Sequence, residues 1–170
     1  MVVIVISGPP GSGKSTVARS LSSKLSLPVL SAGSIFRKLA EELGVSVIEL
    51  NKLAMEKIEI DLKIDKLIID ESRKGNLIVE SHLAAWILEN ADLKVYLNAP
   101  LNERIKRIAK RDNISLERAR VEVISREELQ WRRFKVLYGV DVTDLSVFDL
   151  SFNTSKTPLE VIVNTIINSL

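Results

Sequence analysis

The sequence predicts an α/β protein, a three-layer α/β/α sandwich in which helices cover both faces of a five-stranded parallel sheet. Two observations predict this fold class. Short apolar runs rich in β-branched residues alternate with longer stretches of helical periodicity along the 170 residues, which is typical of βαβ units with right-handed crossovers. In addition, the first apolar run leads through a glycine-rich turn straight into a helical stretch, as a phosphate-binding loop does.

The predicted strands are short, apolar along their length and bounded by polar or turn residues, as strands buried on both faces are. They cover Val2–Ser7, Pro28–Ser31, Asn76–Glu80, Leu93–Asn98 and Val147–Phe152. Because ligands of such sheets bind beyond the carboxyl ends of the strands, the residues that follow each strand are the first candidates for function.

The segments between the strands repeat apolar residues with the period of an α-helix. Helices are predicted over Lys14–Leu25, Ser34–Leu43, Ser46–Met55, Glu59–Arg73, Leu83–Glu89, Leu101–Arg111, Ser115–Val136 and Pro158–Asn168. We expect Ser34 to cap the second of these helices. The length of the chain suits a single domain over residues 1–170.

The composition is that of a globular protein, with 46% hydrophobic and 27% charged residues. A net charge of +2 is nearly balanced and neither favours nor excludes a nucleic-acid partner. The absence of cysteine excludes disulfides, thiol chemistry and cysteine-ligated zinc. No apolar run reaches the ~20 residues that span a bilayer, so we expect a cytoplasmic protein without a membrane partner. We also expect a monomer that binds no nucleic acid, although the sequence leaves an oligomer open.

The turn after the first strand has the G-x-x-x-x-G-K-[ST] pattern of a phosphate loop. Glycines let consecutive N–H groups point into one concavity, and the following helix adds the positive end of its dipole. Lys14 can reach the β- and γ-phosphates, and the Ser15 hydroxyl can bind Mg²⁺. The plain alternative, a strand-to-helix turn without a ligand, does not require this register of strand, loop and helix. The sequence therefore predicts that a nucleoside triphosphate binds Gly8, Pro9, Pro10, Gly11, Ser12, Gly13, Lys14, Ser15 and Thr16.

A second phosphate site is predicted where the second strand ends. Ser31 and Gly33 lie at the strand exit, and Arg37 falls in the first turns of the next helix. A guanidinium in this place suits bidentate binding of phosphate. The alternative is that Arg37 is an ordinary solvated helix residue.

Two groups of arginines follow on later helices. Arg104, Arg107 and Arg111 lie beside an apolar stripe, and Arg118, Arg126, Arg132 and Arg133 share about a third of a helix circumference. The alternative is i,i+4 pairing with glutamates on a solvated surface. The preference for arginine over lysine favours a helical flap that closes over phosphates.

The third strand ends in Glu80, followed by His82, the only histidine. Glu80 is the acidic residue best placed to bind Mg²⁺ opposite the phosphate loop, although an acid at a helix N-terminus would look the same. His82 could contact the substrate or make an incidental polar contact, since phosphoryl transfer between phosphates needs no strong base.

With these residues collected, the chain resembles the nucleoside monophosphate kinases of the P-loop superfamily, and most closely the archaeal-type cytidylate kinases. The resemblance covers nearly the whole length and rests on "ISGPPGSGKST", "SAGSIFR", "EIDLKID", "HLAAW", "LNAPLNERIKRIAKRDNIS", "SREELQWRRF" and "LYGVDVTDLSVFDLSFNTS". It implies Mg²⁺- and ATP-dependent phosphorylation of CMP, and of dCMP too. It also implies a monophosphate-binding insertion over residues 34–74 or so and a helical lid over about 111–138.

The resemblance also implies roles for single residues. Arg37 would bind the CMP phosphate, Asp61 (or Asp65) would accept from the cytosine amino group, and Asn153 and Thr154 would border the adenine of ATP. The implied catalytic groups are Lys14, Arg111, Arg126 and Arg133. Arg107 would join the ATP site, and the implied substrate-binding residues are Ser31, Gly33, Arg37, Asp61, His82 and Arg104. Two positions depart from the family pattern: Ser34 stands in place of an aspartate, and Ser81-His82 stands in place of Gly-Arg, which affects pyrimidine selectivity more than kinase activity.

Two other functions stay open at this point. One is a monophosphate kinase that uses UMP or AMP, or another small-molecule kinase of this size. The other is a non-metabolic P-loop NTPase that acts in RNA or ribosome assembly, in which the arginines would meet nucleic-acid phosphates. The acceptor segment around Arg37 argues against this second function, because a switch lacks a second phosphate site.

Overall fold

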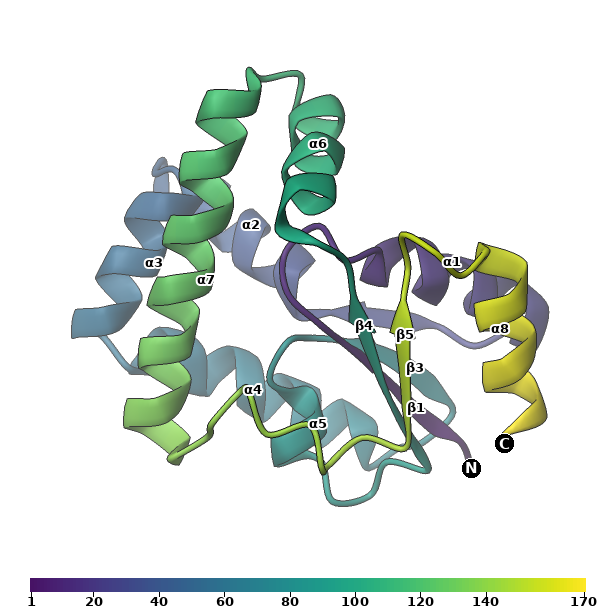
Figure 1. Cartoon of the computed structure of the whole chain (residues 1–170). Helices are drawn as coiled ribbons and strands as arrows, with labels where there is room; N and C mark the ends of the chain where they lie inside the picture. Colours follow the sequence, from purple (N-terminus) through teal and green to yellow (C-terminus); the bar gives the residue numbers. More distant parts are fainter.

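The computed structural model describes residues 1–170 and confirms the three-layer α/β sandwich (Figure 1). Five strands form one sheet in the order β2-β3-β1-β4-β5, and all neighbouring pairs are parallel. The strands are β1 Val3–Ser7, β2 Val29–Ser31, β3 Leu77–Glu80, β4 Leu93–Asn98 and β5 Leu150–Asn153. Strand β1 lies in the centre, so the loop that follows it opens at the middle of the sheet's carboxyl edge.

Eight helices complete the chain. They are α1 Lys14–Leu25, α2 Ala32–Leu43, α3 Val47–Glu56, α4 Glu59–Ser72, α5 Ala84–Ile87, α6 Leu101–Asp112, α7 Leu116–Tyr138 and α8 Leu159–Asn168. No helix is long and apolar enough to cross a membrane.

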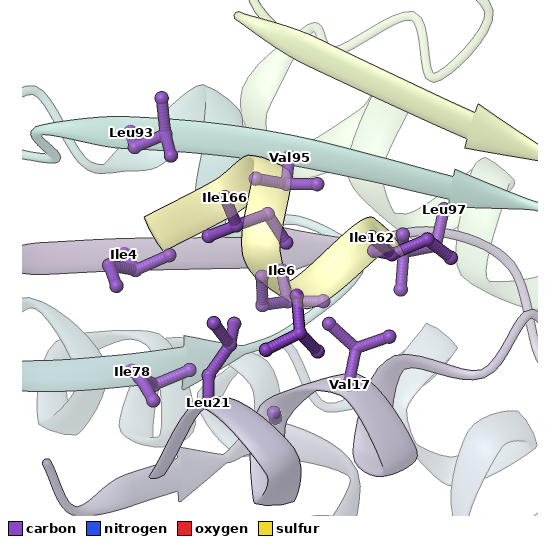
Figure 2. Close-up of a cluster of buried hydrophobic side chains, with 12 residues drawn as sticks. Ile4, Ile6, Val17, Leu21, Ile78, Leu93, Val95, Leu97, Ile162 and Ile166 are labelled. Carbon is purple, nitrogen blue, oxygen red and sulfur yellow. The ribbon is translucent and has the colours of Figure 1, made fainter. Parts of the chain in front are cut away.

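The core lies on both faces of the sheet because successive side chains of a strand point to opposite faces. Ile4 and Ile6 of β1 pack with residues of α1 and α8 on one face, and Figure 2 shows this cluster. Val3 and Val5 pack with residues of α4 and α5 on the other face. Double-sided burial explains why the strands read as unbroken apolar runs rather than as an alternation.

Helices α6 and α7 project beyond the carboxyl edge of the sheet (Figure 1). They pack on each other through a separate apolar cluster that includes Ile105, Ile108, Ala119 and Val123. Helix α7 also packs along α3, so the long helix bridges the end of α6 and the segment between β2 and β3. This arrangement encloses the space above the loop that follows β1.

Several boundaries differ from the predicted ones. Helix α2 begins at Ala32 and its cap is Ser31, whose side chain accepts from the N–H of Ser34; the prediction that Ser34 caps the helix was wrong. Strand β5 begins at Leu150 rather than Val147, because the Phe148 N–H closes a turn onto the Leu145 carbonyl. Helix α5 is also shorter than predicted and covers only Ala84–Ile87.

Candidate active site

The loop from Gly8 to Thr16 depends on glycine for space as well as for conformation. Gly8, Gly11 and Gly13 have φ angles of 146°, 79° and 99°, which side chains with a Cβ rarely adopt. A Cβ on Gly8 would lie 2.0 Å from the Leu97 carbonyl oxygen, and one on Gly11 would lie 2.7 Å from the Arg104 carbonyl oxygen. The backbone of this loop therefore packs closely against the backbone of β4 and α6, which leaves no room for side chains at Gly8 and Gly11.

Lys14 opens helix α1 and lies against the loop. Its Nζ donates to the carbonyl oxygens of Gly8, at 2.8 Å, and Pro9, at 3.0 Å. Burial lowers the pKa of Lys14 to about 8, with a further lowering by the charge of Arg126, while Glu80 acts in the opposite direction. The ammonium group is thus charged at neutral pH, and its charge is poorly neutralised, which favours an anionic ligand.

Ser15 and Glu80, the two predicted metal ligands, are in direct contact. The Ser15 hydroxyl donates to Glu80 Oε1 at 2.6 Å, because Glu80 ends β3 beside the end of β1. A hydroxyl and a carboxylate are oxygen ligands of the kind that Mg²⁺ prefers. No group of three or more His, Cys, Asp or Glu residues could hold a metal ion by itself. The pair therefore fits an ion that takes its remaining ligands from phosphates and water, as Mg²⁺ usually does.

A cavity of about 390 Å³ connects the loop with the segments α2 to α4 and with α7. The predicted site residues that line it are Gly8, Pro10, Gly11, Gly13, Lys14, Ser15, Thr16, Gly33, Arg37, Asp61, Glu80, His82, Arg107, Arg111, Arg126 and Arg133. The predicted residues Pro9, Ser12, Ser31, Arg104, Asn153 and Thr154 do not line it. The structure therefore brings the phosphate loop and the segment around Arg37 together at one cavity.

Three arginines from three helices converge on this cavity. Arg126 of α7 is half-buried, and its Nε atom is buried without a hydrogen-bond partner. Burial lowers the pKa of Arg126 to about 10, with further lowering by the charges of Arg111 and Arg37. Arg111 is paired with the adjacent Asp112 at 2.6 and 2.7 Å, and Arg37 Nη2 donates to the Ser34 hydroxyl at 3.1 Å. A buried, unpartnered Nε on a guanidinium beside two others is costly without an anion, so this cluster is suited to phosphate.

Arg133 of α7 lies deeper and makes a buried ion pair. Its Nε donates to Asp61 Oδ2 at 2.7 Å, and its Nη1 donates to Asn51 Oδ1 at 2.6 Å. The guanidinium also lies 5.6 Å from the centre of the Phe36 ring. One arginine thus joins α2, α3, α4 and α7 around the part of the cavity opposite the phosphate loop.

The neighbouring Asp65 is held in the same way by α7. Tyr138 donates its hydroxyl hydrogen to Asp65 Oδ2 at 2.6 Å. Burial raises the pKa of Asp65 to about 6. The sequence reasoning missed Asn51, Tyr138 and Phe36 in this part of the site. Asn51 offered a signal, since it is a polar residue on the face of α3 that holds Leu50 and Ala54 in the interior.

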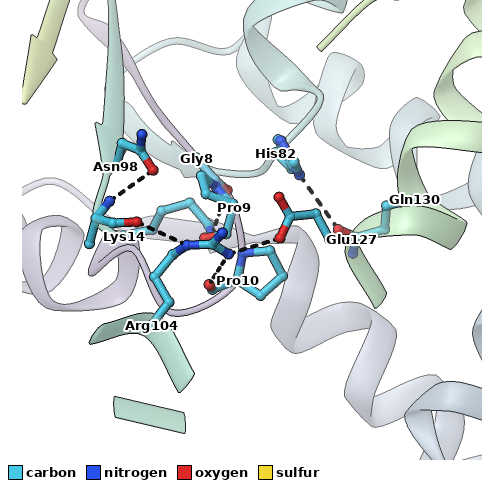
Figure 3. A network of polar contacts seen from close by, with 10 residues as sticks. Gly8, Pro9, Pro10, Lys14, His82, Asn98, Arg104, Glu127 and Gln130 are labelled. Atoms are coloured by element: carbon cyan, nitrogen blue, oxygen red, sulfur yellow. Dashed lines mark hydrogen bonds and ion pairs between the residues drawn. The ribbon is translucent and has the colours of Figure 1, made fainter. Parts of the chain in front are cut away.

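His82 is buried beside Lys14, and its environment keeps it uncharged. Burial lowers the pKa of His82 to about 3, with a further lowering by the charge of Lys14. Nδ1 lies 3.5 Å from Gln130 Oε1, and the ring meets Phe134 edge-on with 5.7 Å between ring centres. Figure 3 shows His82 and Gln130 facing each other along this contact. This site therefore has a neutral group at the position where the resemblance led us to expect an arginine.

Arg107 and Thr154 lie together on the outer side of the loop. Arg107 Nη1 donates to Thr154 Oγ1 at 2.8 Å, and Nη2 donates to the Thr154 carbonyl at 3.1 Å. The Thr154 hydroxyl donates to the Ser12 carbonyl at 2.8 Å. Asn153 uses its side-chain oxygen within its own turn, accepting from Ser155. These residues support the loop from the side of β5.

The sequence pattern of the cytidylate kinase-like family matches residues 3–156. The chain belongs to this family. The match includes every residue predicted for the site and leaves out only residues 1–2 and the segment 157–170, which contains α8.

Curated relatives agree with the family assignment. A protein named cytidylate kinase from Ignicoccus hospitalis is 58% identical over 98% of this chain and 97% of its own length. Proteins of the same name from Staphylothermus marinus and Sulfurisphaera tokodaii are 52% and 57% identical over 98% and 91% of this chain, and over 94% and 87% of their own lengths.

Solved structures show the fold alone, because their sequences are distant. An uncharacterised protein from Eubacterium ventriosum is similar with a TM-score of 0.75 and 15% identity over 99% of this chain and 97% of its own. A shikimate kinase from Acinetobacter baumannii, solved with shikimate, has a TM-score of 0.59 and 15% identity over 99% of this chain and 92% of its own. The fold of this member of the cytidylate kinase-like family is thus shared with other small kinases.

Proposed function

We propose that the protein transfers the γ-phosphoryl group of ATP to CMP, and also to dCMP, giving the diphosphate and ADP in the presence of Mg²⁺. Relatives named cytidylate kinase match nearly the whole chain, and they support an ATP-dependent nucleoside monophosphate kinase. One observation supports the assignment at the level of the site: the glycine-rich loop and an arginine cluster suited to a second phosphate line the same cavity. A nucleotide switch has no use for the second site.

At the donor side, Lys14 would leave the carbonyls of Gly8 and Pro9 and bind the β- and γ-phosphate oxygens of ATP. Ser15 and Glu80 would hold Mg²⁺, which supplies positive charge to those oxygens when bound. Arg107 would lie beside ATP, next to Thr154. Catalysis by such a site consists of positioning and electrostatic stabilisation.

At the acceptor side, Arg37 would bind the phosphate of CMP. The carboxylate of Asp61 shares Oδ2 with Arg133, which leaves its other oxygen for the cytosine amino group. Arg126, with its unpartnered Nε, and Arg111 would neutralise the charge that develops on the phosphoryl group in transfer. Arg133, assigned to catalysis from the sequence, would instead shape the acceptor site through Asp61 and Asn51.

Arg104 does not line the cavity, so the contact with CMP that the resemblance implies is not part of this proposal. UMP or AMP as the preferred acceptor, and a role in RNA or ribosome assembly, are not favoured by the named relatives. A monomeric state and the lack of a nucleic-acid partner stay predictions, which size-exclusion chromatography and a gel-shift assay can check.

The test is an acceptor panel. The protein is incubated with ATP, Mg²⁺ and one of CMP, dCMP, UMP or AMP, and ADP release is followed. We expect fast release with CMP, and also with dCMP, and slow release with AMP. Absence of acceptor-dependent ADP would contradict the kinase assignment, and faster turnover with AMP than with CMP would contradict the choice of acceptor alone.

A further inference from the structure

Arg104 is a buried arginine whose bonds all go to protein groups around the phosphate loop. Its Nε donates to the Ala99 carbonyl at 3.1 Å, and its Nη1 donates to the Pro10 carbonyl at 3.2 Å. The same Nη1 donates to Glu127 Oε2 of helix α7 at 2.9 Å. Only 8% of the Arg104 side chain and 16% of the Glu127 side chain are exposed. Figure 3 shows this guanidinium between Pro10 and Glu127.

The backbone of Arg104 shapes the loop as well. Its carbonyl oxygen, Cα and Cβ lie so near Gly11 that a Cβ there would come within 2.7 to 3.0 Å of them. Residue 104 therefore contacts two successive loop residues, Pro10 through its side chain and Gly11 through its backbone. Because Arg104 Nη1 donates both to the Pro10 carbonyl and to Glu127, a shift of the loop at Pro10 would change how Arg104 holds Glu127.

Glu127 directly follows Arg126 in the sequence of α7, and its ion pair with Arg104 connects this part of α7 to the phosphate loop. Arg126 Nε has no hydrogen-bond partner, so the direction of this guanidinium depends on how α7 itself is held. Two buried ion pairs hold α7: Glu127 with Arg104 toward the phosphate loop, and Arg133 with Asp61 toward the segment between β2 and β3. The first of these is next to Arg126 in the chain.

The geometry points to Arg104 and Glu127 as a pair of positioning residues, which couple the conformation of the phosphate loop to the placement of Arg126 over the transferred phosphoryl group. This inference rests on the proposed function. Neither residue touches a nucleotide in this account. Both act through Arg126, and the loss of either should impair catalysis without removing a ligand contact.

The test is a double-mutant cycle with Glu127→Gln, Arg126→Ala and the combined variant. Glu127→Gln keeps the shape of the side chain and removes the charge that holds Arg104. We expect kcat to fall about 10-fold in Glu127→Gln, with KM for ATP and for the acceptor changed much less. In the Arg126→Ala background, Glu127→Gln should lower kcat by less than about twofold, because the group it positions is already gone.

Glu128→Gln is the matched control. Glu128 pairs with Arg132 on the solvent-exposed side of α7, where 57% and 64% of the two side chains are exposed, so its kcat should equal that of the wild type. If Glu127→Gln folds poorly, Arg104→Lys replaces it in the cycle, since lysine keeps the charge but cannot hold Pro10, Ala99 and Glu127 together.

Multiplicative losses in the double variant, or a lowered unfolding temperature with unchanged kcat, would overturn the inference and leave a merely structural pair. The cycle is measured with the acceptor that the wild-type protein uses fastest. A wild-type preference for another monophosphate would therefore contradict the proposed acceptor and still test the coupling.

Discussion

The two halves of the cavity are built in different ways. The half that we propose binds the donor, here called the donor half, comes from one stretch, Gly8 to Thr16, whose shape is set by glycine conformations and by the backbone of β4 and α6. The acceptor half joins residues far apart in the chain through side chains: Arg133 is bonded to Asp61 and Asn51 across 72 and 82 residues, and Tyr138 to Asp65 across 73.

This difference indicates which residues of each half can be exchanged without altering the fold. The donor loop depends on backbone geometry, so almost any change of a glycine there strains the loop. The acceptor half depends on pairs of side chains, which can change together without altering the fold. We therefore expect the donor to be common to the family and the choice of acceptor to depend on positions such as His82 and Asp61.

The largest effect is expected at the donor half. Lys14→Ala should lower kcat by about 10³-fold, because it removes a preorganised charge from the transferring phosphates. Acceptor-dependent ADP release measures it. Lys24→Ala, on the same helix with its Nζ bonded to Asn164, is the control and should keep full activity. Turnover near the wild-type value in Lys14→Ala would contradict the proposal that the transferred phosphates bind at Lys14.

A change in the acceptor half should act on stability as well. Arg133→Met leaves Asp61 buried without its partner, so we expect the free energy of unfolding to fall by about 3 kcal/mol, together with a raised KM for CMP. Urea unfolding and steady-state kinetics check this. Arg132→Met, which breaks only the exposed pair with Glu128, should cost less than about 1 kcal/mol. Equal losses in the two variants would show that the buried pair has no special role.

Arg37→Ala tests whether the acceptor half can be impaired while ATP binding in the donor half is kept. Loss of one charge-assisted contact to phosphate, about 1.5–3 kcal/mol, should raise KM for CMP by roughly 10- to 100-fold and leave KM for ATP unchanged. Lys38→Ala, one residue on and paired with the exposed Glu42, should change neither value. A loss of ATP affinity in Arg37→Ala instead would put this arginine in the donor half.

The smallest effect concerns pH. Because the pKa of Lys14 is lowered to about 8 in the free protein and bound phosphates would raise it, ATP binding should take up a proton above pH 8. Affinity for ATP should fall about fourfold between pH 7 and pH 8.5, as the charged form becomes the minor one. Calorimetric titration in two buffers of different ionisation enthalpy measures the uptake. Binding without proton uptake at pH 8.5 would contradict the position of Lys14.

Local sequence features predicted the donor half well. The five strands, the parallel sheet and the glycine turn before α1 follow from periodicity and composition, and the structure confirms these elements. The boundaries were less accurate. Ser34 is not the cap of α2, and β5 starts later than predicted because the Phe148 N–H closes a turn onto the Leu145 carbonyl. The Phe148 ring packs against Trp86 and Tyr96, which explains its apolar character.

The acceptor half could be predicted only as a set of residue types. Helical spacing placed Arg126, Arg132 and Arg133 on similar faces of one helix, yet Arg132 is exposed, Arg126 is half-buried and Arg133 is buried. Which arginine is buried depends on a partner from another element, such as Asp61 for Arg133. Such pairings between distant residues leave no local signal in the sequence. The neutral state of His82 likewise follows from burial beside Lys14, which the sequence does not reveal.

In the proposed function, ATP and CMP occupy separate halves of one cavity, and their phosphates meet between Lys14 and Arg126. The most direct measurement is calorimetric binding of adenosine and cytidine joined 5′ to 5′ through a pentaphosphate. We expect one molecule of this compound to bind per chain, far more tightly than ATP or CMP alone, because linked groups bind as one ligand. We also expect it to displace both ATP and CMP. A compound that displaces ATP and leaves CMP bound would contradict it.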